Sequence, residues 1–230
     1  MIFGGIQKLS LLDYPDRTAC TLFTVGCNFY CPFCQNSSLA KPTAKMQTTS
    51  ASEVLDFLKK RQGLLDGICI SGGEPLMHDE LGLFIKDVKA LGFLVKIDTN
   101  GSFPDCLKNL VKSGDIDYVA MDVKNTLEKY PLTIGLPEYD TAPIEDSVAF
   151  LLSGKVPYEF RTTVVREFHT LDDLLSIARW ISGTEKYFIQ GFVDSAGVAQ
   201  CGLNGYSNVE INEFLHTIRT ILPIAQLRGY

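Results

Sequence analysis

Apolar, β-branched segments alternate with segments of helical periodicity along most of this 230-residue chain. Strands are predicted at residues 18–25, 67–71, 94–99, 116–123, 158–165 and 186–193. Helices are predicted at residues 50–61, 81–91, 104–112, 144–152, 170–181 and 208–222, and the pairs Ser50/Glu53 and Thr170/Asp173 are candidate helix caps. Such alternation is typical of parallel βαβ units, so we expect an α/β protein.

The number of predicted units limits the possible architectures. Six βα units are too few to close an eight-stranded barrel of about 250 residues. We therefore expect a partial (β/α)6 barrel of parallel strands, like a TIM barrel but open on one side, with a doubly wound sheet as the alternative. Both architectures place functional residues at the C-terminal ends of the strands.

No repeat or long linker divides the chain, so residues 1–230 are expected to form one domain. Its core is predicted at about residues 16–193, with a C-terminal helix and tail at 206–230. The polar stretch before residue 18 is expected to lack a strand. Residues 125–143, which contain three prolines, are expected to form a loop or a short irregular helix.

Composition argues against several classes of partner and location. The net charge of −6 is the wrong sign for a nucleic-acid-binding protein. No apolar run approaches the roughly 20 residues of a membrane-spanning helix, and no signal peptide is visible. We therefore expect a cytoplasmic protein with reduced cysteines that binds neither nucleic acid nor membrane.

Three of the seven cysteines lie within eight positions, directly after the first predicted strand. Cys27, Cys31 and Cys34 form a CxxxCxxC loop, whereas Cys20 and Cys69 fall inside apolar strands. A 4Fe–4S cluster is normally held by four thiolates, so three leave one iron open for catalysis. A zinc site is the alternative, but structural zinc usually needs a second pair of ligands that is not evident here.

Other polar or glycine-rich motifs follow the later strands. Gly72, Gly73 and Glu74 follow the second strand, and the two glycines allow the backbone to approach a ligand closely. Asp98 and Asn100 end the third strand, Asp122 and Lys124 end the fourth, and Arg161 and Thr163 share one face of the fifth. An ion pair at the surface or ordinary barrel packing is the alternative for these residues, and Asp98 and Asp122 are also candidates to share a cation.

The cysteine loop, with Phe33 before its last cysteine, resembles the signature of the radical S-adenosylmethionine (SAM) superfamily, and residues 72–75 resemble its GGEP motif. The resemblance implies one 4Fe–4S cluster, held by the three cysteines, whose open iron binds the amine and carboxylate of SAM. It also implies that Glu74 and the two glycines before it bind the methionyl amine, and that Lys124 binds the carboxylate. The full predicted SAM-binding set comprises Phe33, Asn36, Gly72, Gly73, Glu74, Asp98, Asn100, Asp122, Lys124, Arg161 and Thr163.

Residues 4–15 resemble one branch of that superfamily, the oxidoreductases that activate anaerobic glycyl-radical enzymes. Within this branch the similarity is greatest to the activating protein of anaerobic ribonucleoside-triphosphate reductase. The resemblance implies cleavage of SAM to a 5′-deoxyadenosyl radical, a glycyl-radical enzyme as partner, and reduced flavodoxin or ferredoxin as electron donor. Gln35 departs from the branch, which usually has a histidine there.

Two other functions remain open at this point. A radical SAM enzyme acting on a small molecule, like carboxydeazaguanine synthase, would share the cofactors, but such enzymes typically vary the cysteine spacing. A non-catalytic iron–sulfur electron carrier would need no motif like residues 72–75.

Overall fold

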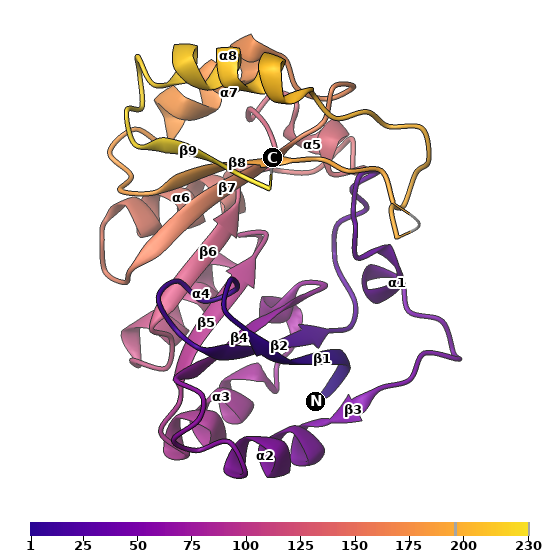
Figure 1. Cartoon of the computed structure of the whole chain (residues 1–230), viewed down its shortest axis with the longest axis vertical. Helices are drawn as coiled ribbons and strands as arrows, with labels where there is room; N and C mark the ends of the chain where they lie inside the picture. The colour runs from indigo at the N-terminus through magenta and orange to yellow at the C-terminus, as the bar shows by residue number, and fades with distance from the viewer. Residues whose placement is uncertain (196, 230) are drawn as a thin grey trace.

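The computed structural model describes residues 1–195 and 197–229, so Tyr230 of the predicted tail lies outside the described residues. One nine-stranded sheet forms its centre, in the order β3-β1-β2-β4-β5-β6-β7-β8-β9 (Figure 1). The strands are β1 (Ile2–Ser10), β2 (Ala19–Thr24), β3 (Thr49–Ser50), β4 (Gly67–Gly72), β5 (Leu94–Thr99), β6 (Tyr118–Asp122), β7 (Tyr158–Val164), β8 (Tyr187–Gly191) and β9 (Ala225–Arg228).

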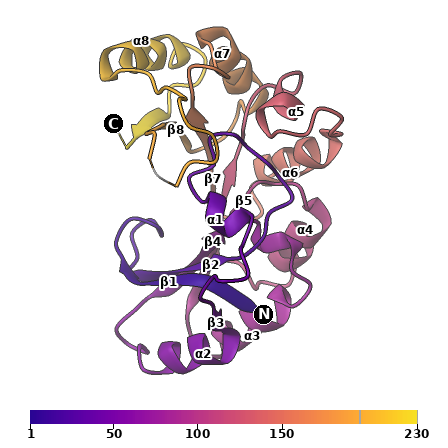
Figure 2. The same ribbon diagram turned by 90° about the vertical axis from the view of Figure 1, so that its right-hand side faces the viewer.

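Helices connect the parallel strands and cover the outside of the curved sheet (Figure 2). They are α1 (Ser37–Ala40), α2 (Ala51–Lys59), α3 (Leu81–Ala90), α4 (Pro104–Lys112), α5 (Tyr130–Thr133), α6 (Ala142–Leu152), α7 (Leu171–Trp180) and α8 (Asn208–Ile218), with a 3-10 helix at Pro75–Met77. Two of them begin where the sequence predicted: Ser50 with Glu53 and Thr170 with Asp173 form complete capping boxes.

The sheet is an open barrel, as predicted. From β2 to β9 all neighbouring strands are parallel, and within the described part of the chain the two end strands, β3 and β9, do not pair with each other. Because the strands are parallel, the ends that follow β2 and β4–β8 all meet at one rim of the barrel. The curved succession of strands can be followed in Figure 1.

The expectation that residues before 18 form no strand is wrong. β1 pairs antiparallel with β2, from Phe3 opposite Thr24 to Ser10 opposite Ala19. Only Phe3 and Ser10 of its nine residues are buried, so the strand lacks the clear apolar alternation of a half-buried strand. Its pairing with β2 is a tertiary contact that composition alone does not predict.

A second strand that the sequence analysis missed, β9, forms one edge of the sheet. β9 follows Pro223 and pairs parallel with β8, and only Ala225 in it is buried. Four residues are too few to show a period of two. The C-terminal tail therefore completes the sheet, while α8 ends at Ile218, four residues before the predicted end.

The interior of the barrel is partly polar. Val95 and Ile97 on β5 pack beneath the outer helices, whereas Lys96 on the opposite face is only 2% exposed. The ammonium of Lys96 contacts the Cys69 sulfur at 3.7 Å and forms an ion pair with Asp98. None of the helices in residues 1–195 and 197–229 has the length and apolar character needed to cross a membrane.

Candidate functional site

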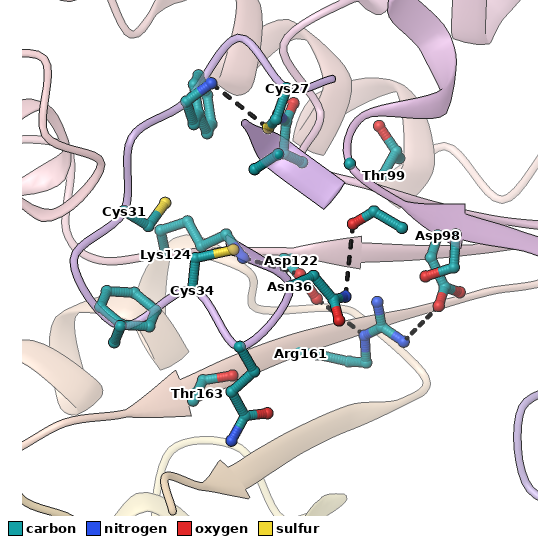
Figure 3. Close-up of a pocket in the computed structure, with 18 of the residues that line it drawn as sticks. Cys27, Cys31, Cys34, Asn36, Asp98, Thr99, Asp122, Lys124, Arg161 and Thr163 are labelled. Carbon is teal, nitrogen blue, oxygen red and sulfur yellow. Dashed lines mark hydrogen bonds and ion pairs between the residues drawn. The ribbon is translucent and has the colours of Figure 1, made fainter. Parts of the chain in front are cut away.

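The three clustered cysteines lie on the loop between β2 and α1 and line one cavity of about 260 Å³ at the rim of the barrel, here called the inner cavity (Figure 3). Cys31 is buried, and Cys27 and Cys34 are half-buried. Burial raises the pKa of the Cys31 thiol to about 12, while the ammonium of Lys124 acts in the opposite direction. Since iron–sulfur clusters bind thiolates, the charge of Lys124 favours the form that binds metal.

The glycine pair after β4 holds the end of this strand against the segment that leads into the cysteine loop. Gly72 has a φ of +107°, a conformation that glycine adopts readily. A Cβ atom on Gly73 would lie 1.8 Å from the carbonyl oxygen of Gly26. The N–H of Gly73 donates to Thr24 at 3.0 Å, and the N–H of Glu74 donates to the same Gly26 oxygen at 2.9 Å. The absence of a side chain at Gly73 therefore allows the end of β4 to pack against the backbone of Gly26.

Glu74 is buried and is not among the residues that line the inner cavity. Its carboxylate is 1% exposed and accepts hydrogen bonds from the Thr99 hydroxyl (2.7 Å), the Asn100 N–H (2.7 Å) and the Leu76 N–H (3.0 Å). Burial raises the pKa of Glu74 to about 7, although these donors favour its ionised form. In this arrangement Glu74 orients the turn after β5.

That turn contacts the cysteine loop through side-chain amides. The Asn100 amide donates to the Asn28 side-chain oxygen at 2.9 Å and lies 3.9 Å from the Cys27 sulfur. Asn28 in turn donates to the Ser102 hydroxyl at 2.9 Å. The ends of β4 and β5 and the cysteine loop are thus joined by one hydrogen-bonded network.

Five charged side chains alternate in sign and form an ion row: Lys96 and Asp98 on β5, Arg161 on β7, Asp122 at the end of β6, and Lys124 just after it. Arg161 lies between the two carboxylates, with its Nη1 3.3 Å from Asp98 and its Nε 2.9 Å from Asp122. Lys124 contacts Asp122 at 2.8 Å at one end, and Lys96 contacts Asp98 at the other. Figure 3 shows Arg161 between Asp98 and Asp122, on the side of the hollow away from Cys31.

The electrostatics of the ion row follow from burial and from these pairs. Burial opposes ionisation of Asp98, but the cations of Arg161 and Lys96 outweigh it and hold the pKa of the carboxyl well below its usual range. The pKa of Asp122 is lowered in the same way by Arg161 and Lys124. Asp98 and Asp122 were candidates to share a cation, and the cation that lies between them in the structure is the guanidinium of Arg161. Among the described residues, no three His, Cys, Asp or Glu side chains converge to hold a single metal ion.

Most of the residues predicted to bind cofactor meet at the inner cavity. Besides the three cysteines, its lining includes Phe33, Asn36, Gly72, Gly73, Asp98, Asn100, Asp122, Lys124, Arg161 and Thr163. Of the predicted set, only Glu74 is not part of the lining. Gln35 also lines the cavity, and its amide donates to the Val193 carbonyl at 3.3 Å.

The sequence analysis missed several lining residues. Ser71 and Thr99 adjoin motifs that it selected, and Gln190 and Gly191 come from β8. Gln190 and Gly191 could have been predicted from the sequence, because they lie near the C-terminal end of the strand predicted at residues 186–193, and this end must reach the same rim.

The N-terminal run that carried the resemblance to activating enzymes does not reach the inner cavity. Tyr14 is buried, and the Asp13 carboxylate accepts from the Thr21 hydroxyl at 2.5 Å. The Ser10 hydroxyl accepts from the Asp13 N–H at 3.1 Å. These residues stabilise the connection between β1 and β2 at the opposite end of the barrel.

The residues at the inner cavity suit an iron–sulfur cluster with SAM. Three thiols from one loop adjoin an ammonium that complements a carboxylate, and the strand ends add amide, hydroxyl and carboxylate groups that complement an amine and a ribose. The rings of Phe29 and Phe33 are buried beside the cysteines and limit access of water.

Comparison with known proteins identifies the family. The sequence matches the radical SAM superfamily over residues 21–181. The chain belongs to this superfamily. Radical SAM proteins use a 4Fe–4S cluster and S-adenosylmethionine, and these are therefore the cofactors of this chain.

The relatives of this radical SAM protein differ in how much of it they match. A Methanocaldococcus jannaschii protein, provisionally named a glycyl-radical enzyme activating enzyme, is 34% identical over 197 residues, which cover 83% of this chain and 80% of the relative. The 7-carboxy-7-deazaguanine synthase of Halobacterium salinarum is 32% identical over 81 residues, which cover 34% and 30% of the two chains.

The fold is shared with more distant proteins. The structure of Streptococcus suis SuiB bound to S-adenosylmethionine superposes with a TM-score of 0.70 at 13% identity, and the match covers 90% of this chain. The chain spans about half of SuiB, 48% of its length. At this identity the likeness supports the open barrel alone.

Proposed function

We propose that this radical SAM protein generates a glycyl radical on a glycyl-radical enzyme, namely an anaerobic ribonucleoside-triphosphate reductase or a related enzyme. The observation that carries the proposal is the similarity to the M. jannaschii protein along most of both chains. The matches to carboxydeazaguanine synthases favour that function less, because those of 32% and 35% identity each cover 34% of this chain, and those that cover 57% and 67% of it are 30% and 23% identical.

The proposed roles of the site residues follow their positions. Cys27, Cys31 and Cys34 are proposed to hold three irons of the cluster, because their sulfurs line one cavity. Lys124 is proposed to bind the carboxylate of SAM, since its ammonium adjoins both this cavity and Cys31. The backbone of Gly72 and Gly73 is proposed to bind the methionyl amine, and Glu74 contributes by orienting Asn100.

The remaining lining residues are proposed to bind the rest of SAM. When bound, the cluster and SAM supply a 5′-deoxyadenosyl radical that removes a hydrogen atom from a glycine of the partner. The protein positions the cofactor and excludes water from it. The polar residues proposed to bind its sugar, base and carboxylate are Asn36, Asp98, Asn100, Asp122, Arg161 and Thr163, with Phe33 against the cluster.

The test of this proposal is formation of a radical on the partner. The protein is reconstituted with iron and sulfide under anaerobic conditions, reduced, and mixed with SAM and a candidate reductase. We expect 5′-deoxyadenosine together with the doublet of a glycyl radical in electron paramagnetic resonance spectra. Replacing the partner glycine with alanine removes the doublet, while Cys34→Ser in this chain removes both signals.

Two results would contradict parts of the proposal separately. Cleavage of SAM without a doublet on any anaerobic reductase, but with turnover of a small molecule, would support a function like that of carboxydeazaguanine synthase. If all three cysteine-to-serine variants still bound the cluster, the assignment of the cluster ligands would be refuted.

A further inference from the structure

The backbone of Lys124 is held by side chains rather than by the sheet. β6 ends at Asp122, so Lys124 lies two positions beyond the strand. Its N–H donates to the Tyr130 hydroxyl at 3.2 Å, and its carbonyl oxygen lies 2.7 Å from Nε2 of His169. Tyr130 and His169 are both fully buried. The position of this lysine therefore depends on two buried side chains.

The contacts of His169 fix which of its ring nitrogens carries the proton. A carbonyl oxygen can only accept, so the contact with the Lys124 carbonyl requires a proton on Nε2. Nδ1 accepts a hydrogen bond from the Val165 N–H at 3.1 Å. Burial lowers the pKa of His169, which favours a neutral ring with this single tautomer. The imidazole is therefore a neutral donor to the Lys124 carbonyl.

The same imidazole packs against the cysteine loop. The ring of Phe33, the residue before Cys34, lies edge-on to His169, with 6.2 Å between the ring centroids. Phe33 is buried and also packs against Phe168, at 5.7 Å. His169 itself is not among the residues that line the inner cavity. It therefore supports two parts of the site from behind the cavity wall.

The turn between β7 and α7 holds this ring in place. The carbonyl of His169 accepts from the Tyr206 hydroxyl at 2.7 Å. The side-chain amide of Asn125, the residue after Lys124, donates to the Phe168 carbonyl at 2.9 Å. The turns after β6 and β7 are thus joined by two hydrogen bonds that involve side chains, one from His169 and one from Asn125.

The side chain of Lys124 enters the site from this fixed backbone. It lines the inner cavity and contacts Asp122 at 2.8 Å, and Figure 3 shows it extending from the side of Cys31 toward Asp122. A lysine side chain is flexible, so its ammonium is placed accurately only when the backbone that carries it is fixed. Loss of the hydrogen bond to the Lys124 carbonyl would free this peptide to rotate and would displace the ammonium.

We propose that His169 is a positioning residue for S-adenosylmethionine, whose Nε2–H holds the Lys124 carbonyl so that the ammonium meets the carboxylate of the cofactor. The inference rests on the role proposed above for Lys124. His169 acts through Lys124, because it does not line the inner cavity. It therefore controls recognition of the carboxylate, whereas the sugar and base of the cofactor are proposed to contact other residues.

The test measures binding of SAM at equilibrium rather than turnover. The cluster-loaded protein is kept oxidised under anaerobic conditions, so that no electron is available to cleave SAM. Equilibrium dialysis with radiolabelled SAM then gives the dissociation constant. His169→Phe keeps an aromatic ring beside Phe33 and removes the donor, and we expect the dissociation constant to rise about tenfold.

Conservative variants at the same position test the hydrogen bond itself. The amide nitrogen of His169→Gln can reach the position of Nε2, so this variant should recover most of the lost affinity. The shorter amide of His169→Asn ends near the position of Nδ1 and leaves the Lys124 carbonyl without its donor. Its dissociation constant should therefore rise about as much as that of His169→Phe.

Decarboxylated S-adenosylmethionine separates positioning of Lys124 from a general loosening of the site. This probe lacks only the carboxylate, so its dissociation constant should change less than twofold in His169→Phe. Lys124→Met removes the same interaction from the side of the protein. Adding His169→Phe to Lys124→Met should therefore raise the dissociation constant for SAM by less than a further factor of two.

Tyr206→Phe is the matched control. It removes the hydrogen bond to the His169 carbonyl from the outer side of the same turn and leaves the imidazole beside Lys124. Its dissociation constant for SAM should stay within twofold of that of the original protein. Urea unfolding shows which variants are folded, and His169→Asn replaces His169→Phe in every comparison if the latter does not fold.

Four results would overturn the inference. They are an unchanged dissociation constant for SAM in folded His169→Phe, an equal loss of affinity for the decarboxylated probe, no recovery in His169→Gln, and an equal loss in Tyr206→Phe. Full additivity with Lys124→Met would refute the route through this lysine.

The same measurements distinguish failure of the proposed function. An unchanged dissociation constant for SAM in Lys124→Met would refute the proposed role of Lys124, and the inference about His169 with it. A missing glycyl radical on the partner would refute the proposed function and leave all these affinities unaltered, because they are measured without reductant and without the partner.

Discussion

Arg161 provides the most direct test of how the site is held together. Its side chain is 12% exposed, and it joins Asp98 on β5 to Asp122 on β6. Arg161→Met removes the guanidinium and keeps most of the aliphatic chain, so the substitution isolates the charge and its hydrogen bonds. Asp122 keeps Lys124 as a partner and Asp98 keeps Lys96.

The expected magnitude follows from these contacts. Breaking a buried ion pair by removing one partner costs about 3–5 kcal/mol, because the other charge is left uncompensated. Here each carboxylate retains a lysine, which places the expected loss at the lower end, about 3 kcal/mol of the free energy of unfolding near pH 7.

The pH dependence has a definite sign. Burial alone would raise the pKa of Asp98 and of Asp122, and their cations lower it below the value in the unfolded chain. This stabilisation is present above the unfolded pKa of about 4 and is lost as the pH falls through the folded pKa. The difference between the original protein and Arg161→Met should therefore be largest above pH 5 and shrink in acid.

Urea unfolding of the cluster-loaded protein under anaerobic conditions measures the effect. A double-mutant cycle with Asp122→Asn isolates the pairwise energy, which we expect to exceed about 1 kcal/mol. Lys108→Met serves as the control, because Lys108 pairs with the more exposed Asp146 at 2.5 Å and such pairs contribute about 1 kcal/mol or less. A loss below 1 kcal/mol for Arg161→Met, or strict additivity with Asp122→Asn, would refute the reasoning.

Three further substitutions test other contacts. Gly73→Ala places a Cβ 1.8 Å from the Gly26 oxygen, so we expect faster loss of the cluster to a chelator, whereas Gly92→Ala, with open space around it, should cost only about 1 kcal/mol of stability. Glu74→Gln turns an amide toward backbone donors and should cost about 1–3 kcal/mol in urea unfolding at pH 8. Burial raises the pKa of Glu74 from 4.5 to about 7, so the stability of the original protein should fall as the pH rises from about 4.5 to 7. The Gln variant, which has no carboxyl to titrate, should not show this fall. Cys31→Ser should abolish the iron–sulfur absorbance while urea unfolding remains cooperative; retention of a full cluster would contradict its role as a ligand.

The sequence by itself determined the parallel α/β architecture and most of the site. Alternating periodicities predict the βα units, and parallel strands bring their C-terminal ends to one rim, so motifs far apart in the chain had to meet. The cysteine spacing is local, which is why Cys27, Cys31 and Cys34 were identifiable without a structure. The capping boxes at Ser50 and Thr170 are local for the same reason.

Only the tertiary structure decided the features that depend on contacts between distant segments. β1 forms beside β2 and β9 forms beside β8 because these neighbouring strands supply hydrogen bonds to them, and their own sequences have little apolar alternation. Glu74 follows a cofactor motif, yet its carboxylate turns toward Asn100, 26 positions away. The N–H of Ala199 likewise donates to the Cys34 carbonyl, a contact between segments far apart in the chain that no local pattern predicts.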